Sequence, residues 1–266
     1  MTAFTLPSPG LGTSGNDEFE QCAQTVADAV EVGYRHVDTA QMYENEAAVG
    51  EGIERADVPR EEVVVATKIH PDNLAYDDAK RTTRESLERL GVDTVDLLYV
   101  HWPISAYDPP ETLRAVQELY DEGLTDHVGL SNFTPELLDE ARALLDAPVV
   151  AHQVECHPLL PQEELLTYAR EAGHALVGYS PLGGGELLDD PLLSEIAAEY
   201  DTSTAAVCLA WAYQREGLVP IPKGVGDHVR ENFEAQELTL DEDDLDRIAA
   251  YDERTRVIDP DAAAWN

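Results

Sequence analysis

An acid and a phenol stand five residues apart after the first apolar stretch of this chain. Asp38 follows the short run that ends at Val37, and Tyr43 comes just before a helical segment that begins near Glu44. If that run is a strand, Asp38 lies at its carboxyl edge, where a loop can bring Tyr43 close to it. A carboxylate beside a phenol can take part in proton transfer, although an acid at a strand end is more often a helix cap or a turn former.

Lysine is scarce in this chain, and two of its three lysines, Lys68 and Lys223, stand where apolar runs end. Lys68 follows five apolar or β-branched residues, which predict a buried strand, so the side chain of Lys68 would be covered as well. A buried ammonium needs a partner for its charge, and Asp38 on the neighbouring strand is the expected one. A purely structural ion pair is the alternative interpretation. It leaves unexplained both Tyr43 and His101, which follows the apolar run 95–100.

Apolar, β-branched runs alternate with segments of helical periodicity along the chain. Besides the run that ends at residue 37, the expected strands are 62–67, 95–100, 127–130, 149–154, 175–178 and 218–221, with a weaker eighth near 233–236. The expected helices are 17–32, 78–90, 111–121, 135–145, 162–171, 203–215 and 241–251. This alternation predicts an α/β fold, a (β/α)8 TIM barrel that forms a single domain over residues 1–266. A doubly wound sheet would need a Gly-x-Gly-x-x-Gly turn after its first strand, and the sequence has none there.

Polar residues follow nearly every expected strand. They are Asp38, Lys68, His101 with Trp102, Ser131 with Asn132, Gln153 with Glu155, Tyr179 with Ser180, and Lys223. The active site of a parallel barrel lies at the carboxyl ends of its strands. Seven such groups at one mouth are difficult to explain as turn formers, so they predict a catalytic site.

The charge of the chain is extreme for a globular protein. Its 54 acidic and 17 basic residues give a formal net charge of −37, spread along the sequence rather than gathered in a tail. Such a surface repels DNA and anionic lipid, which argues against a nucleic-acid or membrane partner. We interpret it as adaptation to a salt-rich cytoplasm in a halophilic organism, because molar salt shortens the screening length to about 3 Å. The alternative, a surface made for a basic partner, predicts one concentrated acidic patch.

The cysteines and the first residues agree with a cytoplasmic protein. Cys22, Cys156 and Cys208 are odd in number and far apart, which gives neither a disulfide framework nor metal-ligand spacing. Cys156 and His157 have no partner at catalytic spacing, so we interpret them as structural. The sequence begins without a signal peptide and has no apolar window of the roughly 18 residues that a membrane span needs.

Together, these motifs resemble the aldo-keto reductase superfamily. The matching stretches are 33–43, 65–68, 99–103, 129–133, 152–158, 179–183 and 221–223, in the family's order across nearly the whole chain. The family is a (β/α)8 barrel that reduces aldehydes and ketones reversibly, with a nicotinamide cofactor and without a metal. The resemblance therefore implies an NAD(P)H-dependent oxidoreductase.

The resemblance assigns Tyr43 as the proton donor to the substrate carbonyl oxygen, with Asp38, Lys68 and His101 completing a catalytic tetrad. The Lys68 ammonium would lower the pKa of the phenol, ordinarily about 10, by favouring the phenolate. Asp38 would keep Lys68 charged and oriented. His101 would hydrogen-bond the carbonyl and place its carbon against C4 of the nicotinamide, from which a hydride passes.

The same resemblance implies a set of cofactor contacts. Ser131, Asn132 and Gln153 would hold the nicotinamide carboxamide, and Tyr179 would stack on the ring. The other expected contacts are Thr13, Asp38, Ser180, Leu182, Lys223, Gly224, Val225, His228, Arg230 and Asn232. Residues 223–232 would bind phosphate with local cations and the N-terminus of a short helix. NADPH is the expected cofactor.

The sequence departs from the family where a 2′-phosphate would bind. Many NADPH-dependent members have Ser after the lysine and Arg four residues before the asparagine, where this chain has Gly224 and His228. The segment is also one residue shorter, and Arg230 is displaced by two positions. Use of NADH is therefore a second possibility. Because a protonated His228 would bind phosphate better, we expect NADPH affinity to rise as pH falls.

The expected substrate pocket is open on one side. Ser14 stands where family members often have Trp, while Trp102 and Ile104 remain as apolar wall. The C-terminal tail is short, and Trp265 either helps to close the pocket or packs under the barrel. We expect small and medium carbonyl compounds, contacted by Ser14, Tyr43, His101 and Trp102, and a monomer, as many relatives are.

Two other classes of function remain open at this stage. A regulatory subunit that binds the cofactor without turnover would not need Asp38, Tyr43, Lys68 and His101 together. A phosphate-binding barrel isomerase or lyase would not need Gln153 or the pair at 131–132. Oxidation of NAD(P)H by an added aldehyde discriminates among the three.

Overall fold

The computed structural model describes residues 4–265 and shows a parallel eight-stranded sheet in the order β1 to β8. The strands are β1 Leu11–Gly12, β2 His36–Asp38, β3 Val64–Ile69, β4 Val95–Val100, β5 Thr125–Ser131, β6 Val149–Glu155, β7 Ala175–Tyr179 and β8 Leu218–Pro220. Gly10 N–H donates to the Pro220 carbonyl at 3.1 Å and Gly12 N–H to the Pro222 carbonyl at 3.0 Å. These bonds form a seam that closes the sheet, so the predicted single-domain (β/α)8 barrel is confirmed.

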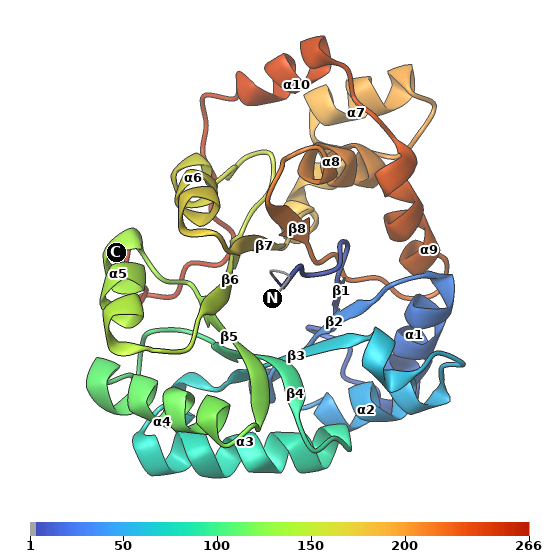
Figure 1. Ribbon diagram of the computed structural model, residues 1–266. Coiled ribbons are helices and arrows are strands. Elements are labelled where there is room, and N and C mark those ends of the chain that lie inside the picture. Colours follow the sequence, from blue (N-terminus) through green and yellow to red (C-terminus); the bar gives the residue numbers. More distant parts are fainter. Residues whose placement is uncertain (1–3, 266) are drawn as a thin grey trace.

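Helices surround the barrel (Figure 1). They are α1 Phe19–Val32, α2 Glu46–Arg55, α3 Tyr76–Leu90, α4 Pro109–Asp121, α5 Pro135–Leu144, α6 Glu163–Ala172, α7 Pro191–Glu199, α8 Thr204–Tyr213, α9 Asp227–Glu234 and α10 Glu242–Ala249. Short 3₁₀ helices include η1 Gln41–Tyr43, η2 Arg60–Glu62, η3 Pro71–Asn73, the kinked η4 Gly183–Asp189 and η5 Ala235–Glu237. Among the described residues, none of these helices is both long and apolar enough to cross a membrane.

Three elements differ from the expectation. The predicted strand near 233–236 is wrong, because these residues end α9 and form η5. Phe233 instead packs its ring 5.0 Å from that of Tyr34, outside the sheet. The missing strand is β1, which is only two residues long and gives no apolar run. Helix α7 was not expected either.

Apolar side chains fill the inside of the barrel. Leu6, Ala66, Leu97, Tyr99, Ala151, Val177, Val219 and Ile221 form one buried cluster. Gly129 makes room for the ring of Tyr99, since a Cβ there would lie 2.4 Å from it. Phe4 packs against His127 near the start of β5, with ring centroids 3.9 Å apart. The first described residues therefore cover the end of the barrel where the strands begin, and the mouth at the other end stays free.

Candidate active site

A cavity of about 540 Å³ opens at the mouth of the barrel, where the strands end. It is lined by Gly12, Thr13, Ser14, Asp38, Met42, Tyr43, His101, Trp102, Asn132, Gln153, Tyr179, Ser180, Pro181, Leu182, Gly184, Gly185, Ile221, Pro222, Lys223 and Ile258. The structure thus gathers most of the expected polar groups into one cavity.

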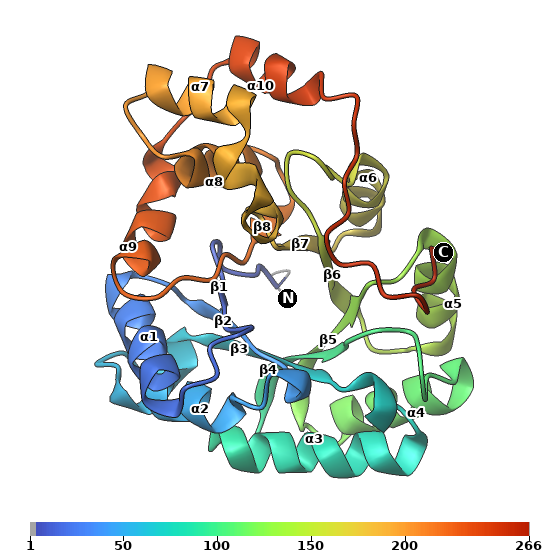
Figure 2. The same ribbon diagram turned by 180° about the vertical axis from the view of Figure 1, so that it is seen from behind.

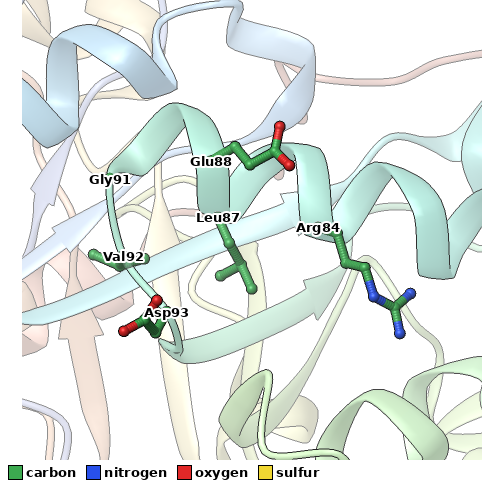
Figure 3. A pocket seen from close by; sticks show the side chains of 6 residues that line it. All are labelled: Arg84, Leu87, Glu88, Gly91, Val92 and Asp93. Atoms are coloured by element: carbon green, nitrogen blue, oxygen red, sulfur yellow. The ribbon is translucent and has the colours of Figure 1, made fainter.

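A second, shallower hollow lies beside the end of α3 (Figure 3). Its volume is about 420 Å³, and it is lined by Arg84, Leu87, Glu88, Gly91, Val92 and Asp93. These residues precede β4, whereas His101 follows it, so the hollow lies at the opposite end of that strand. It contains none of the expected site residues and is no candidate for the chemistry.

The buried ion pair of Lys68 and Asp38 lies at the base of the cavity. Lys68 is on β3, fully buried, and its ammonium donates to the Asp38 carboxylate at the end of β2. The same nitrogen donates to the Thr39 carbonyl at 2.9 Å. The strands are in register so that Asp38 pairs with Ala66, two residues before Lys68. Two neighbouring strands therefore bring the charges together, as the sequence predicts.

Tyr43 reaches the same ammonium from the turn η1. Its hydroxyl lies 3.4 Å from Lys68 Nζ, and its ring centroid lies 4.9 Å from that nitrogen. The turn is held at its first residue, because the Gln41 side-chain oxygen accepts from His70 N–H at 2.9 Å and from Asn73 Nδ2 at 3.0 Å. The phenol is thus fixed beside a cation at the edge of the cavity.

Burial decides the protonation state of the phenol. Burial raises the pKa of Tyr43, the Lys68 ammonium lowers it, and the Asp38 carboxylate raises it again, so that the net change is upward. The effect of Lys68 has the predicted sign, but burial outweighs it. The pKa of Lys68 is raised as well, because Asp38 and Tyr43 outweigh the burial that opposes its charge. At neutral pH the site therefore combines a protonated phenol with an ammonium.

His101 follows β4 and faces Tyr43. The two rings meet edge to face with centroids 5.8 Å apart. Burial lowers the pKa of His101 well below its ordinary value, and the charges of Lys68 and His70 lower it further. Its imidazole is therefore neutral at physiological pH, and one ring nitrogen can donate a hydrogen bond.

Amide and hydroxyl groups continue the network across three further strands. Gln153 Nε2 on β6 donates to the second Asp38 oxygen at 2.8 Å. Asn132 Nδ2 donates to the His101 carbonyl and to Ser131 Oγ, both at 3.0 Å. Tyr179 OH on β7 donates to Asn132 Oδ1 at 2.9 Å. We call these residues, together with Lys68, the mouth network: Asp38, Lys68, Ser131, Asn132, Gln153 and Tyr179.

Most of the expected nicotinamide contacts face the cavity. Asn132, Gln153 and Tyr179 line it, as do Ser180 and Leu182. Thr13 lines it too, and its hydroxyl donates to the Asp38 carbonyl at 3.0 Å. Ser131 differs, because it is fully buried beneath Asn132 and its hydroxyl donates to the Gln153 carbonyl at 3.0 Å. A carboxamide needs donors and acceptors beside a flat ring, and this wall supplies both, so the residues fit a nicotinamide.

The segment that is expected to bind phosphate, which we call the 223–232 loop, lies mostly outside the cavity, unlike the expected nicotinamide contacts. Lys223 lines the cavity, whereas Gly224, Val225, His228, Arg230 and Asn232 are outside its lining among the described residues. Asn232 Nδ2 donates to the Lys223 carbonyl at 3.2 Å and holds the loop. A Cβ on Gly224 would lie 3.1 Å from this amide and from Val229 N, so glycine lets the chain run close to the start of α9.

Two exposed basic side chains of the 223–232 loop, those of His228 and Arg230, already have acidic partners. His228 Nδ1 lies 2.8 Å from a Glu231 carboxylate oxygen. Arg230 lies 3.9 Å from Glu234, and both side chains are more than half exposed. The structure therefore pairs the two basic side chains with acids on their own helix. The sequence analysis did not predict this pairing.

The substrate side of the cavity has both expected and unexpected walls. Ser14 and Trp102 line it as predicted, but Ile104 is not part of its lining among the described residues. Trp265 packs against Trp102 with ring centroids 5.6 Å apart. It therefore lies beside the wall of the pocket and not under the barrel. Met42 also lines the cavity; the sequence analysis did not name it, although its position beside Tyr43 indicates this.

The tail residue Ile258 also lines the cavity, although the sequence gives no signal for it. It lies more than two hundred positions from the first site residues, in a stretch without helical or strand periodicity. Only the path of the tail across the barrel mouth brings it to the cavity.

Comparisons with known proteins agree with this geometry. The Aldo/keto reductase family model matches residues 9–253. Methylglyoxal reductase DkgB of Salmonella typhimurium is 38% identical over 269 residues, which cover 99% of this chain and 100% of that protein. MGS-M4, an aldo-keto reductase from a Medee basin deep-sea metagenome library, is similar in structure with a TM-score of 0.90 at 32% identity, over 96% of this chain and 95% of that one. Bombyx mori aldo-keto reductase in complex with NADP has a TM-score of 0.87 at 32% identity, over 96% and 92% of the chains.

The chain belongs to the aldo/keto reductase family. The predicted superfamily is confirmed, and with it an oxidoreductase that reduces aldehydes and ketones to alcohols with a nicotinamide cofactor. Small-molecule carbonyl compounds are the class of substrate that fits this family.

Proposed function

We propose that Tyr43 is the proton donor of this reductase and that Asp38, Lys68 and His101 complete its catalytic centre. The nicotinamide, when bound, supplies the hydride that reduces the carbonyl carbon. Tyr43 gives its hydroxyl proton to the carbonyl oxygen, which completes the alcohol. In the reverse direction the Tyr43 phenolate takes that proton back.

One contact carries this proposal, the 3.4 Å approach of Lys68 Nζ to the Tyr43 hydroxyl. As the phenol loses its proton, the negative charge develops beside a buried ammonium that stays in place. A fixed charge in a site shielded from water stabilises such a change more than water does. Asp38 keeps the ammonium oriented, since it accepts from Lys68 on one oxygen and from Gln153 on the other.

We further propose the role of His101 and the contacts of the nicotinamide. A neutral His101 donates a hydrogen bond to the carbonyl oxygen and fixes the orientation of the substrate. Asn132 and Gln153 hold the carboxamide, Ser131 orients them from beneath, and Tyr179 covers one face of the ring. Thr13, Asp38, Ser180 and Leu182 complete this part of the site.

NADPH is the cofactor that we propose, with NADH as the alternative. Lys223 is an exposed cation at the cavity edge, and no carboxylate within ion-pair distance is found for it among the described residues. Gly224, Val225, His228, Arg230 and Asn232 would form the rest of the 2′-phosphate site. The Bombyx mori relative in complex with NADP supports this choice.

The substrate that we propose is a small or medium carbonyl compound. The cavity of about 540 Å³ has Ser14 rather than a bulky residue on one wall, and Trp102 on another. Tyr43 and His101 are the groups that meet the carbonyl. The Salmonella typhimurium relative is a methylglyoxal reductase, and methylglyoxal is therefore the first compound to assay.

We also propose that the net charge of −37 reflects a halophilic source and a cytoplasm rich in salt. Residues 1–266 then act as one domain and as a monomer, because like-charged surfaces repel each other, and the same repulsion disfavours nucleic acid and membranes. Gel filtration and thermal unfolding in dilute and in molar potassium chloride test this. We expect a monomer whose Tm rises with salt; a salt-independent Tm would contradict the interpretation.

A direct assay tests the activity itself. In molar salt the purified protein is expected to change the fluorescence of NADPH on binding and to oxidise it when methylglyoxal is added. Binding without oxidation by any carbonyl compound of a panel would favour the regulatory alternative. Titration with NADH in parallel establishes which cofactor is preferred.

A further inference from the structure

A buried carboxylate at the end of β6 binds the backbone of the C-terminal tail. Glu155 is fully buried, and one of its oxygens accepts from Val257 N–H at 2.7 Å while the other accepts from Ile258 N–H at 2.8 Å. His157 Nε2 lies 2.9 Å from the first oxygen. Two consecutive N–H groups of a segment without regular structure therefore converge on one carboxylate.

The same tail forms part of the substrate cavity. Figure 2 shows it leaving α10, passing α6 and β6, and ending beside α5. Ile258 lines the cavity and is 39% exposed. Further on, Trp265 packs against Trp102, and the Arg256 guanidinium lies 4.0 Å from the Trp265 ring centroid. The tail therefore supplies the side chain of Ile258, one of the two residues whose N–H groups Glu155 binds, to the cavity wall.

A backbone hydrogen bond also holds the tail just before this stretch. Thr255 N–H donates to the Leu159 carbonyl at 3.1 Å, just before the stretch that Glu155 binds. Arg256 to Ile258 lie in no helix or strand. Hydrogen bonds to an ionised acceptor are roughly twice as strong as neutral ones, so each bond to Glu155 attaches this stretch more firmly than a neutral backbone bond would. Burial raises the pKa of Glu155, but His157 and the two N–H groups lower it below its ordinary value, so the carboxylate stays charged.

We propose that Glu155 is a positioning residue that determines substrate selectivity: it holds the tail so that Ile258 forms one wall of the carbonyl pocket and Trp265 packs against Trp102, another wall residue. Strand β6 then serves two parts of the site, since Gln153 and Glu155 are two residues apart and share one face of the strand. Gln153 belongs to the mouth network, and Glu155 belongs to the substrate wall. This inference rests on the proposed reductase function.

The carboxamide variant Glu155→Gln tests the assignment, because it keeps the shape but presents an amide to one of the two N–H groups. We expect hydrogen exchange at the amides of Val257 and Ile258 to accelerate by about tenfold or more. The KM for an aromatic aldehyde should rise by about tenfold, whereas KM for methylglyoxal and the Kd of NADPH change by less than about twofold. Glu164→Gln, on exposed α6, is the control with the same change of charge.

A purely structural role predicts other results. If Glu155→Gln lowers Tm and weakens NADPH binding as much as it raises KM for the aromatic aldehyde, the proposal is wrong. Unchanged exchange at residues 257–258 would also overturn it. If the wild-type protein oxidises NADPH with none of the carbonyl compounds of the panel, the proposed function fails, while the exchange measurement still reports on the attachment of the tail.

A second pair of variants separates the carboxylate from the wall that it holds. Ile258→Ala should raise KM for the aromatic aldehyde without changing exchange at Val257. In the Ile258→Ala background, Glu155→Gln should add much less to KM than it does alone, because both act on one wall. Independent, multiplying effects would contradict the proposal. If Glu155→Gln does not fold, Val257→Pro removes one of the two donors from the tail and should give the same increase in KM; an unchanged KM would overturn the proposal.

Discussion

The mouth network and the 223–232 loop, at the two ends of the proposed cofactor site, use their polar groups in opposite ways. In the mouth network, Asp38, Lys68 and Gln153 are buried and bonded to one another. In the loop, His228 and Arg230 are exposed and paired only with acids one turn away. A buried group that loses its partner is costly, whereas an exposed pair contributes little.

The difference teaches which part of the site can change freely. Each member of the mouth network depends on groups from other strands, so a substitution there disturbs several bonds. The loop can exchange one cation for another, and this is where the sequence departs from the usual family pattern. We therefore expect the chemistry to be robust and cofactor selectivity to be adjustable.

The largest effect is expected at the phenol. Tyr43→Phe removes the proton donor, so kcat for methylglyoxal reduction should fall by about 10²–10⁴-fold. Lys68 keeps its bonds to Asp38 and the Thr39 carbonyl, so the fold should persist. Steady-state kinetics and NADPH fluorescence titration measure the two properties. A variant that keeps its rate would remove Tyr43 from the proposed role.

A smaller loss is expected for Gln153→Leu. This change leaves one buried Asp38 oxygen without the donor that now lies 2.8 Å away. An unpaired buried acceptor costs about 1–3 kcal/mol, so kcat/KM should fall by about tenfold to a hundredfold. Gln117→Leu, on the outer helix α4, controls for general loss of stability. Equal effects of the two variants would show that the mouth network has no special role.

Changes in the 223–232 loop should be modest and of either sign. Glu231→Gln and Glu234→Gln release His228 and Arg230 for phosphate, so NADPH should bind about two- to fivefold more tightly. His228→Ala and Arg230→Ala should weaken it by a similar factor. NADH affinity should stay constant in all four variants, and titration with both cofactors measures this. Parallel changes for NADH would show that the loop does not bind the 2′-phosphate.

The smallest effect is expected from pH on the chemical step. The pKa of Tyr43 is raised and that of His101 is lowered, so the phenol stays protonated and the imidazole neutral between about pH 6 and 9. The kcat of reduction should therefore be flat there and fall only as pH rises through the pKa of Tyr43. A protonated imidazole binds phosphate better than a neutral one, so the ratio of NADPH to NADH binding constants should instead favour NADPH as pH falls if His228 contacts the 2′-phosphate. A pH-independent ratio would remove His228 from the site.

The sequence predicts the inner strands well, for a physical reason. A parallel strand that is buried on both faces, such as β3, has to be a continuous apolar run, and Lys68 at its end is therefore conspicuous. The short β1 has no such run. Two residues, Leu11 and Gly12, are enough to pair with the neighbouring strand β2, so no longer apolar stretch is needed. Sequence reasoning therefore placed the eighth strand at 233–236, where Phe233 packs against Tyr34 instead.

Contacts between distant segments were beyond the sequence. Nothing in the residues around Ile258 indicates that two of their N–H groups meet Glu155, about one hundred positions earlier. The same holds for Ser131, which the sequence places at the mouth but the structure buries beneath Asn132. Side-chain direction at a strand end depends on the last turn of the strand, and residue type alone does not determine it.

The seam between β1 and β8 limits how this barrel can evolve. Pro222 lacks an N–H, so it accepts from Gly12 but cannot return the bond that a parallel ladder would send to the Gly10 carbonyl. Any side chain at Gly10 would meet the His36 ring at 2.3 Å, and one at Gly12 would meet the Ile221 carbonyl at 2.7 Å. The outer helices can accept many acidic residues on their exposed faces, whereas Gly10 and Gly12 in the seam cannot be replaced by larger residues without a clash. Acidic surface residues and barrel closure thus depend on separate sets of residues, so a change of charge on the outer helices leaves the seam unaltered.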